Sequence, residues 1–220
     1  KLIQRFFNNE VKNTIVYDFS EASKKKLIQI TKSKVGGGPT IGPKTPKVPR
    51  IPSTFRGQPF IFKEHQKKAL EAWKKENGQC ILAMATGAGK TITAAWGIVR
   101  LFEGLSSKNL SLFVIVVVPL NNLGHQWQEE LEVFNIESLK CFDSANKWKE
   151  TLSSKITEFN IDQSNKKPNF LCIITNNQTL KGDTFQGAIQ SINRDSMLLV
   201  GDECHHHNTE LSLQKLPKTK

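Results

Sequence analysis

The sequence lacks the features of a membrane or secreted protein. No apolar run reaches the 18 or so residues of a membrane-spanning helix, and the charged, asparagine-containing N-terminus is unlike a secretory signal. The four cysteines are widely spaced, without the close pairs of a zinc ribbon, at positions Cys80, Cys141, Cys172 and Cys204. We therefore expect a soluble protein of a bacterial or phage-like cytoplasm, or of the nucleus, with buried, reduced thiols and no membrane partner.

Positive charge is concentrated in the first third of the chain. Residues 1–78 contain 17 Lys or Arg and 6 Asp or Glu, whereas residues 79–220 contain 14 of each, so the first part carries the whole net charge of +11. A basic leader on a neutral domain suits a polyanionic partner such as DNA or RNA, because phosphate contacts release counterions. A lysine-rich surface that serves only solubility is the alternative.

Composition divides the 220 residues into three parts. Residues 1–34 are too short for a core of their own, and we interpret them as an N-terminal arm or the tail of an upstream domain. Residues 35–53 contain three consecutive glycines and five prolines, which predicts a linker. Residues 54–220 form the main domain, long enough to bury one good core.

Apolar runs alternate with helical patterns through the main domain. Strands are expected at 81–84, 111–118, 139–142, 170–175 and 197–201, helices at 63–75, 91–102, 122–134, 146–156 and 183–192, and a polar loop at 160–168. This alternation predicts an α/β fold with a mainly parallel sheet and helices on both faces. Ligands of such a sheet bind at the carboxyl ends of its strands.

The segment Ala83–Thr91, here called the phosphate turn, lies between a short apolar run and the start of a predicted helix. Backbone N–H groups in such a turn converge on a polyphosphate, a lysine reaches the terminal phosphates and a hydroxyl binds Mg²⁺. The predicted nucleotide-binding residues are Thr86, Gly87, Ala88, Gly89, Lys90 and Thr91. The general pattern requires glycine where Met84 stands, and an ordinary glycine turn with a solvated lysine is the alternative.

Two adjacent carboxylates follow the last predicted strand, 112 residues after Lys90. Because side chains alternate along a strand, Asp202 and Glu203 are expected to point in different directions and to take different roles. We predict that Asp202 and Thr91 hold Mg²⁺ and that Glu203 positions and deprotonates the attacking water. A solvated strand end is the alternative. The adjoining residues 205–207, all histidine, have no further ligands at a suitable spacing for a metal site.

The segments Thr86-Gly87-Ala88-Gly89-Lys90-Thr91 and Asp202-Glu203-Cys204-His205 resemble motifs I and II of superfamily 2 helicases and translocases of the DExH type. The similarity is closest to the motor subunits of restriction enzymes, in which a methionine at the position of Met84 is usual. The second segment also resembles innate-immune helicases of double-stranded RNA. The resemblance implies a RecA-like P-loop NTPase domain that uses ATP and Mg²⁺, and it leaves the type of nucleic acid open.

Further residues match the family in the expected order. By resemblance, Gln66 reads adenine, although Lys63 and His65 replace the usual arginine and tyrosine. The resemblance also implies that His205 couples the nucleotide site to a second motor domain, and that Lys90, Asp202, Glu203 and His205 form the catalytic set. Two further motifs place nucleic-acid contacts at Pro119, Leu120, Asn121, Thr175 and Asn176. A helix cap after a buried strand is the alternative for each of these two motifs.

These observations predict the first motor domain of an ATP-dependent DNA helicase or translocase, with DNA favoured over RNA. An RNA helicase or an ATP-switched nucleic-acid sensor is the main alternative, and the ordered motifs disfavour a small-molecule kinase. The resemblance implies a second RecA-like domain downstream, since the next expected motif is not reached before Lys220. We therefore expect residues 1–220 to bind nucleotide and to hydrolyse it poorly.

Overall fold

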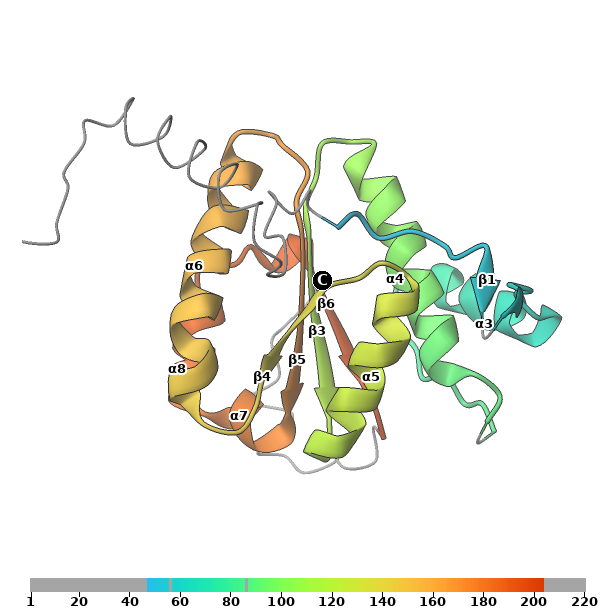
Figure 1. Cartoon of the computed structure of the whole chain (residues 1–220). Helices are drawn as coiled ribbons and strands as arrows, with labels where there is room; N and C mark the ends of the chain where they lie inside the picture. The colour runs from blue at the N-terminus through green and yellow to red at the C-terminus, as the bar shows by residue number, and fades with distance from the viewer. Residues whose placement is uncertain (1–46, 56, 86, 204–220) are drawn as a thin grey trace, which may run out of the picture. The chain divides into compact units, whose positions relative to one another are not determined.

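The computed structural model describes residues 47–55, 57–85 and 87–203 (Figure 1). Their main feature is a four-stranded parallel sheet in the order β4-β5-β3-β6. The strands are β3 (Leu112–Val118), β4 (Ser138–Cys141), β5 (Phe170–Asn176) and β6 (Met197–Gly201). A short antiparallel pair, β1 (Thr54–Phe55) and β2 (Gln58–Pro59), precedes them.

Strand β3 is central because all seven of its residues are apolar and buried. A strand with two apolar faces must be covered on both sides, as in parallel sheets between helices. Val116 lies in register with Ile174 of β5 and with Val200 of β6. Because the strands are parallel, their carboxyl ends lie along one edge of the sheet. The segments that follow the strands therefore begin at this edge.

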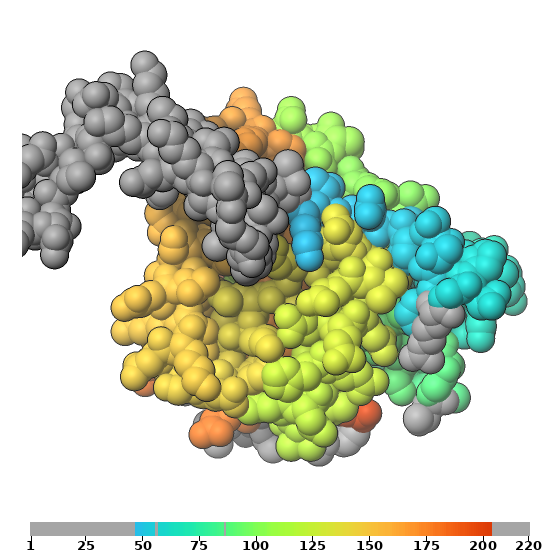
Figure 2. Space-filling view, viewed as in Figure 1, coloured from blue at the N-terminus to red at the C-terminus, as the bar shows by residue number. Residues whose placement is uncertain are grey.

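Helices cover both faces of the sheet, as Figure 1 shows. On one face, α4 (Lys90–Ser106) and α5 (Asn121–Val133) pack on the side chains of Val114, Val116 and Val118. On the other face, α6 (Ala145–Ser164) and α8 (Asp183–Ile189) pack on Phe113, Ile115 and Val117. Figure 2 shows the side chains of α5 and α6 on either side of the edge strand β4. The expected α/β class with helices on both faces is confirmed.

Three shorter or peripheral elements complete the domain. Helix α3 (Glu64–Lys75) packs on α4, where Gly97 leaves room for the side chain of Leu70. Helix α7 (Asn177–Lys181) follows β5, and a 3₁₀ turn, η2 (Arg194–Ser196), leads into β6. None of the described helices combines the length and the apolar character needed to span a lipid bilayer.

Two expectations about the secondary structure were wrong. Residues 81–84 form no strand, because their N–H groups bond locally: Ala83 donates to Ile81 and Met84 to Leu82, at 3.0 and 2.9 Å. Strand β6 is therefore, like β4, an edge strand of the described sheet. The loop expected at 160–168 begins as helix, because the buried ring of Phe159 packs edge-on against Phe113 and α6 continues to Ser164.

The last residues of the predicted linker contact the main domain. The N–H of Arg50 donates to the carbonyl of Phe134, and the side-chain amide of Asn135 donates to the carbonyl of Val48, at 2.9 and 2.7 Å. These bonds attach residues 48–50 to the end of α5. The arm at 1–34 and the first part of the linker lie outside the described residues, and the three-part division stays a prediction.

Candidate nucleotide and nucleic-acid sites

The phosphate turn leads directly into α4. Gly87 and Gly89 have φ values of +75° and +86°, a conformation that side chains disfavour, and Gly89 is the N-cap of the helix. The first turn of α4 contains no acidic residue, and the N–H groups that begin any α-helix lack partners within it. A β-carbon added at Gly87 would have no heavy atom within 4 Å, so the turn is open on this side. The start of α4 is therefore free of acidic side chains, and nucleotide binding by the turn stays a prediction.

The start of α3 contacts the backbone of the phosphate turn. His65 Nε2 lies 3.1 Å from the carbonyl oxygen of Ala88, and Gln66 Nε2 donates to the carbonyl of Gly89 at 3.4 Å. The other end of the Gln66 amide accepts from the N–H of Lys63 at 2.9 Å, and Gln66 is only 5% exposed. In this conformation Gln66 supports the turn, and adenine recognition stays a prediction. The sequence indicated no contact for His65.

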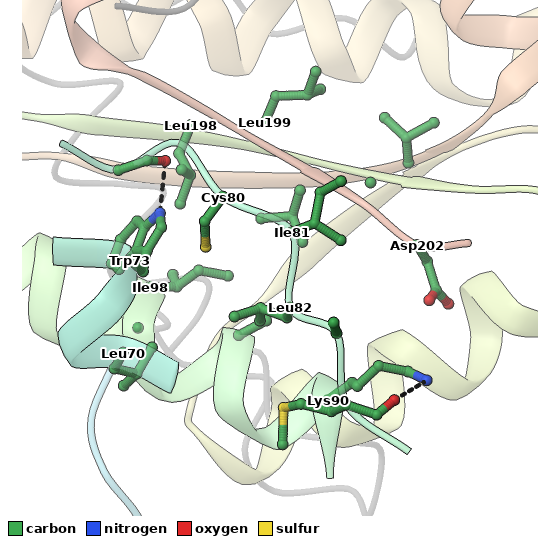
Figure 3. A pocket seen from close by; sticks show the side chains of 18 of the residues that line it. Leu70, Trp73, Cys80, Ile81, Leu82, Lys90, Ile98, Leu198, Leu199 and Asp202 are labelled. Atoms are coloured by element: carbon green, nitrogen blue, oxygen red, sulfur yellow. Dashed lines mark hydrogen bonds between the residues drawn. The ribbon is translucent and has the colours of Figure 1, made fainter. Parts of the chain in front are cut away.

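Lys90 and the two carboxylates line one cavity of about 740 Å³. The cavity is mostly apolar, with α4, β6 and residues 80–84 in its wall. Figure 3 shows the ammonium group of Lys90 and the carboxylate of Asp202 at the same end of it. The Lys90 ammonium donates to the carbonyl of Met84 at 3.2 Å, so the predicted phosphate ligand is held by its own turn here. The structure therefore brings together residues that are 112 positions apart.

Asp202 and Glu203 follow β6 where the chain leaves the sheet. The N–H of Asp202 donates to Val117 at 2.8 Å, and its carboxylate accepts from Trp127 Nε1 at 2.9 Å and from the N–H of Glu203 at 3.1 Å. Glu203 has a φ of +51°, outside the strand region. The two side chains are therefore separated by a backbone turn, and the strand alternation assumed from the sequence does not reach them.

The predicted nucleic-acid residues lie at the same edge of the sheet, beyond β3 and β5. Asn121 donates to Asp143 at 2.7 Å, and Asn176 donates to Asn121 at 2.8 Å; we call these three residues the amide cluster. Leu120, the N-cap of α5, is 61% exposed beside them, and Pro119 is half-buried. Sequence reasoning missed Asp143, although its position directly after a strand of the sheet was a usable signal.

Two of these residues also have structural contacts. Asn176 caps α7 by accepting from the N–H of Thr179 at 2.7 Å. Thr175 is fully buried, and its hydroxyl donates to the carbonyl of Cys141 at 2.9 Å. Because Thr175 faces the interior, its side chain is unavailable to nucleic acid in this structure, and the prediction for Thr175 is corrected to a role in the fold.

The cysteines behave differently from one another. Cys141 and Cys172 are buried, and burial raises the pKa of the Cys141 thiol to about 12 and that of Cys172 further still. Cys80 is exposed, against expectation, and lies in the wall of the cavity. The described cysteines are free thiols, as expected, and no group of three potential metal ligands occurs among the described residues. Thr86, Cys204 and His205 lie outside the described residues.

The parallel sheet with helices on both faces, the glycine turn at the start of α4 and the carboxylates after β6 are consistent with a RecA-like α/β domain. The family model described as "Type III restriction enzyme, res subunit" matches residues 60–219. The chain belongs to this family and contains the first RecA-like domain of a superfamily 2 helicase or translocase, as the resemblance predicted.

One relative supports this assignment. The chain is 27% identical over 129 residues to the ATP-dependent DNA helicase MER3 of Saccharomyces cerevisiae, a match that covers 57% of this chain and 10% of the yeast protein. The chain thus corresponds to a small part of that relative. No solved structure gives a significant match.

Proposed function

We propose that this motor domain binds ATP with Mg²⁺ at the phosphate turn and, with a second RecA-like domain, couples ATP hydrolysis to movement on DNA. The observation that carries the proposal is the convergence of Lys90, Asp202 and Glu203 on one cavity. A cation, two carboxylates and the N-terminus of a 17-residue helix meet there. This is the set of groups that phosphoryl transfer uses for positioning and charge stabilisation.

The residues present fit Mg–ATP. Gly87 has no side chain and no heavy atom near its β-carbon position, which allows phosphates to approach the turn from this side. Asp202 and Thr91 offer the oxygen ligands that Mg²⁺ prefers. When bound, Mg²⁺ would supply neutralisation of the phosphate charge. Lys90 would give up its hydrogen bond to Met84 to contact a phosphate oxygen, and Glu203 would orient the attacking water and accept its proton.

The DNA partner is supported by the basic segment 1–78 and by the name of the yeast relative. Four of the five predicted contacts remain in the proposal: Pro119, Leu120, Asn121 and Asn176. They lie at the sheet edge that also holds Asp202. Competition between labelled single-stranded DNA and unlabelled DNA or RNA of the same sequence measures the preference. Stronger competition by RNA would favour the RNA helicase alternative.

Substitution of Lys90 tests the nucleotide site. Loss of a charge-assisted hydrogen bond worth about 1.5–3 kcal/mol is expected to weaken ATP binding by Lys90→Ala roughly 10- to 100-fold. Lys108→Ala removes an exposed lysine beyond the other end of α4 and is expected to leave affinity unchanged. Titration calorimetry measures both affinities, and equal affinity of Lys90→Ala and the unaltered chain would refute the assignment.

Glu203→Gln separates a motor from an ATP-operated switch in a protein that contains both RecA-like domains. We expect ATP to remain bound and DNA movement to stop, because the amide cannot accept a proton from water. Retained recruitment to nucleic acid as the only biological output would instead indicate a switch. Single-turnover hydrolysis and a strand-displacement or triplex-displacement assay provide the measurements.

A further inference from the structure

One hydrogen bond links a buried tryptophan of α5 to the proposed Mg²⁺ ligand. Trp127 is 4% exposed, and its indole N–H donates to Asp202 Oδ2 at 2.9 Å across 75 residues of sequence. The ring packs in the core between α5 and the sheet, together with Leu131 and Val116. Core packing therefore fixes the position of the donor, whereas Asp202 lies just beyond the last residue of β6.

The remaining contacts of Asp202 complete its orientation. The N–H of Glu203 donates to Oδ1 at 3.1 Å, while the backbone N–H of Asp202 is bonded to β3 through Val117. Each carboxylate oxygen can accept two hydrogen bonds, so one lone pair on each oxygen is left for another ligand. With both oxygens and the backbone bonded, the rotation of this carboxylate about its side-chain bonds is restricted.

The indole N–H of Trp127 is a suitable partner for a carboxylate that binds a metal ion. Indole N–H is neutral and can only donate, so it orients a carboxylate without cancelling its charge. An arginine or lysine in this place would neutralise the carboxylate and compete with a cation. The nearby ammonium of Lys90 is bonded to the carbonyl of Met84, which leaves the Asp202 charge for another partner.

We propose that Trp127 is a positioning residue for Mg²⁺ binding, because its indole N–H holds the Asp202 carboxylate in the orientation that receives the ion. This inference rests on the proposed ATP site. It concerns the contribution of Mg²⁺ to nucleotide affinity, and it assigns Trp127 no contact with nucleotide. Metal ligands depend on such outer hydrogen bonds for their orientation.

Trp148 provides a matched control. It is 3% exposed and packs in the core on the opposite face of the sheet, but its indole N–H has no acceptor in the described structure. Trp127→Phe and Trp148→Phe therefore remove the same atoms from equally buried sites. Only the first substitution removes a hydrogen bond.

The experiment measures ATP affinity of the 220-residue chain with and without Mg²⁺ by calorimetry. For Trp127→Phe we expect unchanged affinity in EDTA and a two- to tenfold smaller enhancement by Mg²⁺, because the Asp202 carboxylate loses one orienting hydrogen bond. Trp148→Phe should retain the full enhancement. In an Asp202→Ala background, Trp127→Phe should have no further effect on the enhancement, because the acceptor is gone.

An enhancement in Trp127→Phe equal to that of the unaltered chain would overturn the positioning role and leave the ATP site standing. Absence of ATP binding by the unaltered chain would overturn both proposals. If Trp127→Phe does not fold, a tryptophan analogue with sulfur in place of the ring N–H keeps the shape and removes only the donor. Full Mg²⁺ enhancement with that analogue would equally refute the proposal.

Discussion

At one edge of the sheet, the amide cluster is joined by side-chain hydrogen bonds of 2.7 and 2.8 Å. The carbonyls of the phosphate turn are contacted by four side chains at 2.9 to 3.4 Å, those of His65, Gln66, Lys90 and Thr93. Besides the two side-chain bonds that join the cluster, Asn176 also accepts from the N–H of Thr179. Near the turn there is a cavity of about 740 Å³. The proposed nucleic-acid contacts would therefore compete with bonds already made, whereas the phosphate turn borders open space.

The largest effect in this comparison is expected at Gly89. Alanine there would adopt a disfavoured φ of +86° and place its β-carbon 2.7 Å from Gln66 Nε2. We expect Gly89→Ala to destabilise the domain by about 1–3 kcal/mol and to weaken ATP binding by about tenfold or more. Denaturant unfolding and calorimetry measure the two effects.

Gly104 is the control for this substitution, because it lies inside α4 and a β-carbon there meets no atom within 4 Å. Gly104→Ala should stabilise the domain by about 0.5–1 kcal/mol through helix propensity, with unchanged affinity for ATP. If Gly89→Ala bound ATP as well as Gly104→Ala, the turn would not be the nucleotide site.

A smaller effect is expected in the amide cluster. Asn176→Ala removes the cap of α7 and the bond to Asn121, and we expect a loss of about 1–2 kcal/mol in the free energy of unfolding. The side-chain oxygen of the neighbouring Asn177 is buried and accepts no hydrogen bond in the described structure. Asn177→Ala should therefore lower the free energy of unfolding by less than Asn176→Ala does. Equal losses in the two variants, measured by urea unfolding, would contradict a preformed cluster.

The smallest expected effect is a difference in thiol reactivity. Cys80 borders the cavity, whereas Cys141 and Cys172 are buried in the sheet, so iodoacetamide should label Cys80 first in a Cys204→Ser background. Partial burial and, secondarily, the charge of Glu76 raise the Cys80 pKa, so its labelling at pH 8 should be slower than that of free cysteine and should increase with pH.

Glu76→Gln removes the secondary cause and should modestly accelerate Cys80 labelling at a fixed pH. Peptide mass spectrometry over a time course gives the rate at each cysteine. Labelling of Cys172 as fast as that of Cys80 would show that the sheet opens as readily as the cavity wall.

Local sequence predicted most elements of the fold. The apolar run of β3 and the period of α3 are visible because strand and helix periodicities act over a few residues. The same local reasoning failed at 81–84, where an apolar run implied a strand although its N–H groups bond within the segment. It also ended α6 too early, because the packing of Phe159 against Phe113 is a contact between distant residues.

The sequence by itself determined the α/β alternation, the glycine turn before α4 and the carboxylates after β6, since each depends on neighbouring residues. Tertiary structure decided the order of the strands, and with it the approach of Asp202 to Lys90 and to Trp127. It also turned Thr175 inward and joined Asn121 to Asp143. These contacts arise from strand pairing and helix packing over tens of residues, distances at which local periodicity carries no information.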